Sequence, residues 1–185
     1  SEMCIRDRDT DGLIHAGSGL DQVTWMDVRV GDWVATPRHG KPVEINALWY
    51  NALCTMDMLQ ARFGDNDDSY RQLASLVKAS FNKRFWNENT GCLYDVVDED
   101  DDTIRPNQIY AVSLPFTMLD REREKAIVDT VMDKLYVGCG LRSLNPDHKD
   151  YHPIYIGSLS KRDHAYHQGT AWGFLLGGFI LSLIH

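Results

Sequence analysis

The chain has 185 residues, 43% hydrophobic and 10% aromatic, which suffices for one domain with a substantial core. Its 27 acidic and 19 basic residues give a formal net charge of -8. No Lys/Arg-rich stripe is present, which argues against nucleic acids and anionic membranes as partners. Four widely spaced cysteines without a CxxC pair argue against a metal site and fit reduced thiols in the cytoplasm.

Both ends of the chain look foreign to the fold. The segments "SEMCIRDR" (residues 1–8) and "LSLIH" (residues 181–185) resemble translated sequencing-adapter read-through, so we exclude them and expect one partial domain over residues 9–180. The longest apolar run, residues 174–184, is shorter than the roughly 20 residues that span a bilayer. This run therefore predicts a core helix.

Two amphipathic helices are predicted first. Gly64 and the polar residues after it indicate the end of the first helix, and the second covers residues 67–86. The short polar turn between them predicts an antiparallel helical hairpin. The apolar face of the first helix contains Ile45, Leu48, Trp49, Ala52, Met56, Leu59 and Phe63, and that of the second contains Tyr70, Leu73, Ala74, Val77, Phe81 and Phe85.

The middle of the chain alternates short patterns. "GCLYDVV" (residues 91–97) indicates a strand, and the acidic run at 98–102 lacks the spacing of a calcium loop and is expected to be a solvated loop. Helical spacing then returns in "RPNQIYAVSLPFTML", where Pro115 predicts a kink or an end.

The C-terminal part carries two further predicted helices. Asp120 is expected to cap a helix that places Ile127, Val131 and Leu135 on one face. An irregular stretch, residues 137–163, precedes a last apolar helix from about His164. About five helices in total predict an all-α fold.

Polar clusters lie at helix starts or in the segments that lead into them. These clusters are "TWMD", "TPRHGKPVEIN", "IRPNQIY" and "RDHAYHQGTAW". If successive inner helices of a barrel or bundle point the same way, their corresponding ends meet at one mouth. We therefore expect one cleft to collect all four clusters.

Asp27 is the candidate catalytic acid. Aromatic walls from Trp25 and Trp33 would desolvate its charged form and favour the protonated state that a general acid needs. Alternatively, Asp27 caps a turn or pairs with Arg29. Glu44, in the first helical turn, is favoured by the helix dipole without any function.

Uncharged hydrogen-bonding groups and aromatic rings near the same helix starts suit a sugar. Asn107, Gln108, His167 and Gln168 could bind hydroxyl groups. Flat apolar faces for pyranose rings could come from Trp25, Trp33, Trp49, Tyr110, Tyr166 and Trp172. Taken singly, each of these aromatic residues is better explained by core packing.

Five ordered motifs resemble one family. "TWMD", "TPRHGKPVEINALWYNAL", "RPNQIYAVSLPF", "GLRSLNP" and "AYHQGTAW" are similar to the C-terminal glucosidase domain of glycogen debranching enzymes, the amylo-alpha-1,6-glucosidase family, in its prokaryotic type. The resemblance implies an (α/α)6 barrel of the six-hairpin glycosidase kind, a cytoplasmic enzyme of glycogen breakdown, and hydrolysis of the alpha-1,6-linked glucose at a trimmed branch point.

The resemblance also implies roles for particular residues. Asp27 matches the general acid of the TWMD motif. The sugar pocket would be lined by Trp25, Arg38, Glu44, Asn46, Trp49, Asn107, Gln108, Tyr166, His167, Gln168 and Trp172. The partner would be an alpha-glucan, glycogen or a limit dextrin, with no nucleic acid and no membrane involved. No metal or cofactor is implied, since two carboxylates suffice for glycoside hydrolysis.

The general base is missing from the motifs. Eukaryotic-type members have a glutamate two positions after HQG, where this chain has Ala171. In the prokaryotic type we expect the base in a glutamate-containing segment beyond the last helix. A twelve-helix barrel needs on the order of 200 residues as a lower bound. The chain is therefore expected to be less than half of the barrel and inactive alone.

Besides a plain helical domain with no site, two alternatives remain open. One is another glycoside hydrolase on the same barrel, acting on trehalose-like or glucosylated small molecules. The other is a non-catalytic glucan-binding module, for which Ala171 is the only support.

Overall fold

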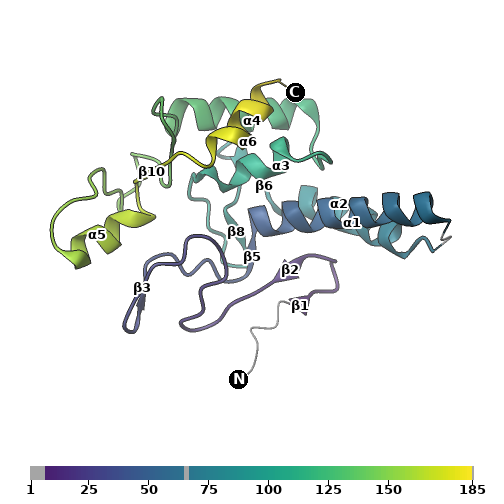
Figure 1. Cartoon of the computed structure of the whole chain (residues 1–185), viewed down its shortest axis with the longest axis horizontal. Helices are drawn as coiled ribbons and strands as arrows, with labels where there is room; N and C mark the ends of the chain where they lie inside the picture. The colour runs from purple at the N-terminus through teal and green to yellow at the C-terminus, as the bar shows by residue number, and fades with distance from the viewer. Residues whose placement is uncertain (1–6, 65–66, 185) are drawn as a thin grey trace.

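The structure is a computed structural model that describes residues 7–64 and 67–184. Residues 1–6 and residue 185, parts of the two terminal segments that the sequence analysis set aside, lie outside the described residues. Within the described part, helices dominate (Figure 1). They are α1 (Val43–Phe63), α2 (Ser69–Arg84), the 3-10 helix η1 (Pro106–Ile109), α3 (Tyr110–Ser113), α4 (Arg121–Lys134), α5 (Leu159–Tyr166) and α6 (Leu176–Ile184).

Short antiparallel pairs of strands tie the loops together, so a purely all-α description is incomplete. The strands are two residues long and pair as β1 (Asp7–Arg8) with β2 (Ile14–His15), β3 (Arg29–Val30) with β4 (Trp33–Val34), β5 (Lys41–Pro42) with β8 (Val96–Val97), β6 (Trp86–Asn87) with β7 (Cys92–Leu93), and β9 (Leu141–Arg142) with β10 (Ala171–Trp172). The strand expected within residues 91–97 is thus two strands, each paired with a different segment.

The predicted hairpin of α1 and α2 is confirmed. Gly64 ends α1 in the left-handed conformation, with φ 78°, and its N–H donates to the carbonyl of Gln60. The apolar face of α2 is buried as expected, with Val77 and Phe81 both fully inaccessible to solvent.

The apolar face that periodicity marks on α1 is not the buried one. Leu48, Met56 and Phe63 are exposed, and Phe63 retains 79% of its accessible surface. The helix instead buries Val43, Ala47, Tyr50 and Leu53 against the core. Because α1 carries apolar residues on most of its circumference, spacing alone does not show which side finds a neighbour.

Helices α1, α3 and α6 form a contiguous row. α3 packs against both α1 and α6, while α2 packs on α1 and α4 contacts η1 and α6 (Figure 1). Side-chain contacts between the loops that precede α1, η1 and α6 place those loops at one end of the row. The loops that lead into α1, η1 and α6 therefore meet, as the sequence analysis expected.

The helix of residues 121–134 begins and packs as predicted. Asp120 accepts a hydrogen bond from the backbone N–H of Arg123 at 2.9 Å, which is the N-cap interaction. Ile127, Val131 and Leu135 are completely buried. The preceding helical stretch ends at Ser113, two residues before Pro115, because proline disfavours a helical conformation before it.

The single last helix expected from about His164 is wrong. The chain forms α5, leaves helical geometry at His167, and starts α6 only at Leu176. Gly169, with φ 143°, lies between them, and a Cβ there would come within 2.5 Å of the carbonyl oxygen of His152. The backbone thus crosses another loop closely at a position that only glycine allows.

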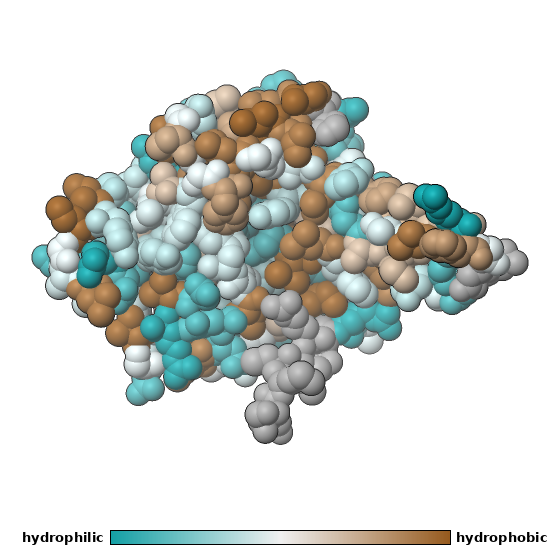
Figure 2. Space-filling view, viewed as in Figure 1, coloured by the Kyte–Doolittle hydropathy of each residue, from teal (hydrophilic) through white to brown (hydrophobic). Residues whose placement is uncertain are grey.

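Hydrophobic residues cover the outer side of α6 (Figure 2). Ile180, Leu181, Leu183 and Ile184 are each at least half exposed. Among the described residues, no helix, α6 included, is long and apolar enough to cross a membrane. An exposed apolar surface of this kind favours association with another apolar surface.

We expect the 185-residue chain to self-associate through α6. Replacing Ile180 by lysine places a charge in this apolar surface and should shift the chain towards the monomer in sedimentation velocity. Ala79→Lys, on the exposed side of α2, is the matched control and should leave the distribution unchanged. A wild-type chain that is monomeric throughout would contradict this prediction.

Candidate active site

The segment before α1 folds back on itself and presents Asp27 outward. β3 pairs with β4, and the ladder is extended by the N–H of Ala35, which donates to the carbonyl of Val28 at 3.0 Å. Just before this ladder, Met26 is 1% exposed, whereas the Asp27 carboxyl next to it is 61% exposed.

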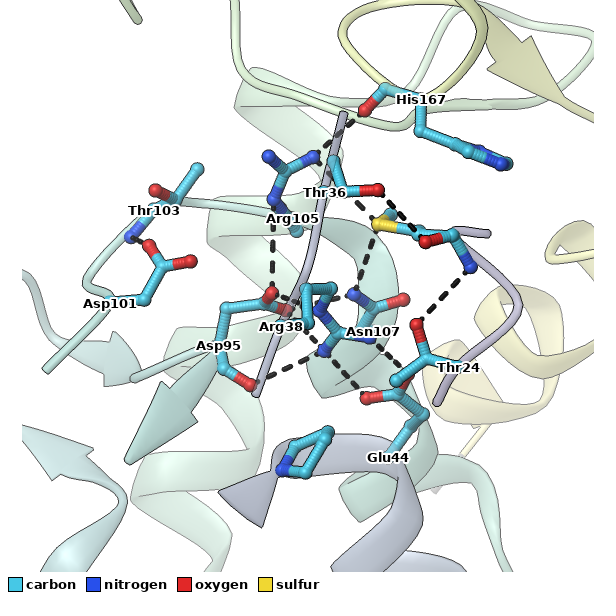
Figure 3. Close-up of polar contacts among 12 residues, drawn as sticks. Thr24, Thr36, Arg38, Glu44, Asp95, Asp101, Thr103, Arg105, Asn107 and His167 are labelled. Atoms are coloured by element: carbon cyan, nitrogen blue, oxygen red, sulfur yellow. Dashed lines mark hydrogen bonds and ion pairs between the residues drawn. The ribbon is translucent and has the colours of Figure 1, made fainter. Parts of the chain in front are cut away.

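Beneath this segment lies a buried ionic network centred on Arg38 (Figure 3). Its guanidinium group forms a bidentate ion pair with Glu44, in which Nη2 and Oε2 are 2.7 Å apart. It forms a second bidentate ion pair with Asp95, in which Nε donates to Oδ2 at 2.6 Å and Nη2 donates to Oδ1 at 3.0 Å. All three side chains are at most 4% exposed. Arg38 has φ 46°, a strained backbone conformation that this set of contacts holds in place.

Burial and charge act against each other in this network. Burial alone would lower the pKa of Arg38, but the carboxylates of Asp95 and Glu44 outweigh it and raise that pKa, so the guanidinium group stays charged. Burial raises the pKa of the Asp95 carboxyl, although Arg38 and Arg105 both oppose this. Burial lowers the pKa of Arg105, which Asp95 only partly offsets.

Asn107 joins the ionic network to the aromatic wall. Its Oδ1 accepts a hydrogen bond from the indole N–H of Trp25 at 2.8 Å, and its Nδ2 donates to Oδ1 of Asp95, also at 2.8 Å. Asn107 is fully buried at the start of η1. The orientation of the Trp25 ring is therefore fixed by a residue 82 positions away in the chain.

Arg105 ties the third loop to the same network. It donates to the carbonyl groups of Ser143 at 3.0 Å and His167 at 2.9 Å, and to Oε1 of Gln168 at 2.9 Å. Its Nε lies 3.7 Å from Asp95. The loops before α1, η1 and α6 are thus held together by two buried guanidinium groups.

His167 is enclosed by aromatic rings. Its ring stacks on Trp172, with centroids 5.6 Å apart and planes inclined by 22°, and meets the edge of Trp25 at 5.1 Å. Only 1% of the side chain is exposed, and neither ring nitrogen has a hydrogen-bond partner among the described residues. Its Nε2 lies 3.6 Å from Oδ1 of Asp27.

The imidazole of His167 is neutral near pH 7. Burial lowers its pKa to about 4, while Asp27 partly opposes this and Arg105 and Arg38 reinforce it. A neutral imidazole carries one N–H and one lone pair. It can therefore donate to a carboxylate without forming an ion pair.

This shift makes stability depend on pH. An unfolded histidine takes up a proton near pH 6.5, whereas His167 in the folded chain does so only near pH 4, so the free energy of unfolding falls as the pH drops through this window. The expected loss between pH 7 and pH 4.5 is about 2 kcal/mol. Urea unfolding at several pH values should show that the free energy of unfolding falls more steeply with decreasing pH in wild type than in His167→Gln. Parallel pH profiles of the two proteins would contradict this prediction.

Most of the predicted site residues lie in this region. The linked contacts of the three loops include Asp27, Trp25, Arg38, Glu44, Asn107, Tyr166, His167, Gln168 and Trp172. Trp33, however, stacks on His164 at 4.2 Å. The expectation that aromatic walls desolvate Asp27 is wrong for this chain, because its carboxyl remains mostly in water.

Three predicted sugar-binding residues are engaged with the backbone instead. Asn46 accepts from the N–H of Ile14 and donates to the carbonyl groups of Ile14 and Pro42. The indole of Trp49 donates to the carbonyl of Gly12. Gln108 donates to the carbonyl of Arg105 and accepts from the N–H of Leu93. These contacts hold loops rather than present groups to a ligand.

Sequence reasoning missed Asp95 and Arg105. Asp95, which immediately precedes the buried strand β8, is 2% exposed, and Arg105 is 6% exposed. The available signal was a charged residue among apolar neighbours, Asp95 in "LYDVV" and Arg105 in "IRPN". Apolar neighbours draw such a residue into the core, where a charged side chain is seldom found without a partner of opposite charge.

A cavity of about 320 Å³ opens beside the network. Its lining includes Arg38, Arg105 and Gln168, together with acidic and hydroxyl side chains such as Asp101 and Thr103, but not Asp27. Within the described residues, no group of three His, Cys, Asp or Glu side chains is placed to hold a metal ion. Together, the three loops offer an exposed carboxyl group, aromatic faces and fixed hydrogen-bonding groups.

Comparison with known proteins agrees with the motifs. The sequence model of a family described as amylo-alpha-1,6-glucosidase matches residues 3–185. The chain is also 28% identical over 222 aligned residues to the glycogen debranching enzyme of Saccharomyces cerevisiae, and the alignment covers 94% of this chain but 14% of that relative.

Proposed function

We propose that this chain, which belongs to the amylo-alpha-1,6-glucosidase family, supplies the acid side of a glycosidase acting on alpha-1,6 branch points of glycogen or related alpha-glucans. The chain spans 14% of the length of the yeast relative, so the activity of a complete debranching enzyme is part of this proposal. In the proposed protein, the row of α1, α3 and α6 contributes inner helices to an (α/α)6 barrel.

The observation that carries the proposal is the position of Asp27. Its carboxyl group reaches solvent at the place where three loops converge, while its own backbone sits above a buried network that cannot shift without exposing charges. A general acid needs this combination of access to substrate and fixed position. Trp25 and Trp172 beside it offer apolar surface for a pyranose ring.

In the proposed mechanism, Asp27 protonates the glycosidic oxygen as the bond to the anomeric carbon breaks. A second carboxylate, about 6.5 to 9.5 Å away, removes a proton from the water that attacks the opposite face of the sugar. We expect this base in a glutamate-containing segment outside the 185 residues. The 185-residue chain alone should therefore release no glucose.

Glucose release from a phosphorylase limit dextrin whose branches have been trimmed to a single alpha-1,6-linked glucose tests the proposal. The assay uses the longest gene product that contains these 185 residues, with linear alpha-1,4 maltooligosaccharides as the comparison substrate. We expect free glucose from the dextrin and at least tenfold less from the linear chains. No glucose from the dextrin, or equal release from both substrates, would overturn branch-point hydrolysis.

A further inference from the structure

His167 is a buried polar side chain whose ring nitrogens are not satisfied by hydrogen bonds within the described residues. Leaving a buried donor unpaired is unfavourable, so such a group usually has a partner in some functional state of the protein. Oδ1 of Asp27 lies 3.6 Å from its Nε2. This separation is longer than a hydrogen bond.

The histidine cannot move towards Asp27, but Asp27 can move towards the histidine. The ring is held between Trp25 and Trp172, and the backbone carbonyl group of His167 accepts a hydrogen bond from Arg105. The Asp27 side chain is mostly exposed, so little packing opposes a small rotation of its carboxyl group towards Nε2. Hydrogen bonds in a catalytic site are often long before substrate binds and shorten afterwards, so a sugar that covers Asp27 would close the gap.

We propose that His167 is a positioning residue for the catalytic acid: its Nε2–H donates to Oδ1 of Asp27 and thereby leaves the acidic proton on Oδ2. This inference rests on the proposed function of Asp27 as the general acid. In a carboxylic acid, the oxygen that accepts a hydrogen bond acts as the carbonyl oxygen, and the other oxygen carries the proton. Oδ2 is then the atom that faces the glycosidic oxygen.

The charged surroundings keep His167 suited to this role. The groups that act on it are Asp27 from the first loop, Arg38 below it and Arg105 from the loop before η1, with the phenol of Tyr166 against its ring. Two positive charges and burial oppose protonation of the ring, against one negative charge. The imidazole therefore stays unprotonated near pH 7 and remains a neutral donor.

The tautomer that this contact requires can be tested in the 185-residue chain, whether or not that chain is active, because an Asp27 oxygen 3.6 Å from Nε2 already favours a proton on that nitrogen before the gap closes. Long-range nitrogen–proton NMR of chain labelled with ¹⁵N-histidine should show His167 as the Nε2–H tautomer and neutral at pH 6. Asp27→Ala should produce a mixture of both tautomers, whereas Asp32→Ala in the β3–β4 turn should change nothing. An Nδ1–H tautomer in wild type, or no response to Asp27→Ala, would overturn the inference.

The catalytic consequence is tested with two variants of similar size in the glucose-releasing gene product. His167→Gln places an amide N–H near the position of Nε2, whereas His167→Met fills the same space without a donor. We expect the glutamine variant to keep kcat within about tenfold of wild type and the methionine variant to lose about a hundredfold, both with KM nearly unchanged. Equal losses in the two variants would indicate a packing role and refute positioning.

The two proposals can fail separately. If the wild-type gene product releases no glucose from the limit dextrin, the proposed function fails, and the tautomer measurement still decides whether His167 donates to Asp27. If wild type is active and both variants match it, the proposed function stands and the positioning role is refuted.

Discussion

Replacing Arg38 by methionine is expected to lower the free energy of unfolding by about 3 to 5 kcal/mol, the usual cost of removing one partner from a buried ion pair. The variant leaves Glu44 and Asp95 buried without their shared guanidinium group. Neither carboxylate can reach water without opening the contact between the loop before α1 and strand β8. The loss should therefore be larger than a cavity of similar size would cause.

Urea unfolding followed by circular dichroism measures this change. Lys125→Met is the matched control, because it breaks the exposed pair with Asp129, whose two side chains are 76% and 62% exposed. The control should change the free energy of unfolding by less than about 1 kcal/mol. A loss below 1 kcal/mol for Arg38→Met would show that the network does not hold the loops together.

The second large effect concerns catalysis. Asp27→Asn is expected to lower glucose release from limit dextrin by about 10²- to 10⁴-fold, the usual contribution of a positioned general acid. Asparagine has almost the same shape but no proton to give at this step. Because the carboxyl is exposed and lies outside the buried network, stability should change little.

The matched control for this variant is Asp32→Asn. Asp32 is an exposed aspartate in the turn between β3 and β4, five residues along the chain from Asp27. It should keep wild-type release of glucose. A loss of activity in Asp32→Asn as large as that in Asp27→Asn would indicate a general effect of charge on this loop.

Helices that follow local rules were predictable from the sequence. The N-cap at Asp120, the glycine end of α1 at Gly64 and the stop before Pro115 are each set by the chemistry of one residue and its immediate neighbours. The break between α5 and α6 was not predictable in this way. It depends on Gly169, which allows the chain to pass close to a loop that lies 17 residues earlier.

The site was predicted only in part, for a similar reason. Helix starts identified the loops that meet, and the motifs identified Asp27, Arg38 and Glu44. Asp95 was hidden because a buried carboxylate is recognisable only once its partner is known, and Arg38 is separated from it by 57 positions. Likewise, Asn46 and Trp49 carry suitable groups for a sugar, but backbone carbonyl groups brought near by folding already occupy them.

The acid role of Asp27 is tested most directly with alpha-glucosyl fluoride, because fluoride departs without needing a proton from an acid. The measurement compares the rates of wild type and Asp27→Asn on this substrate and on limit dextrin, in the gene product that contains the chain. If Asp27 is the general acid, the variant keeps the fluoride rate within about tenfold while losing dextrin hydrolysis by at least about a hundredfold. Equal losses on both substrates, or dextrin hydrolysis that survives the substitution, would contradict it.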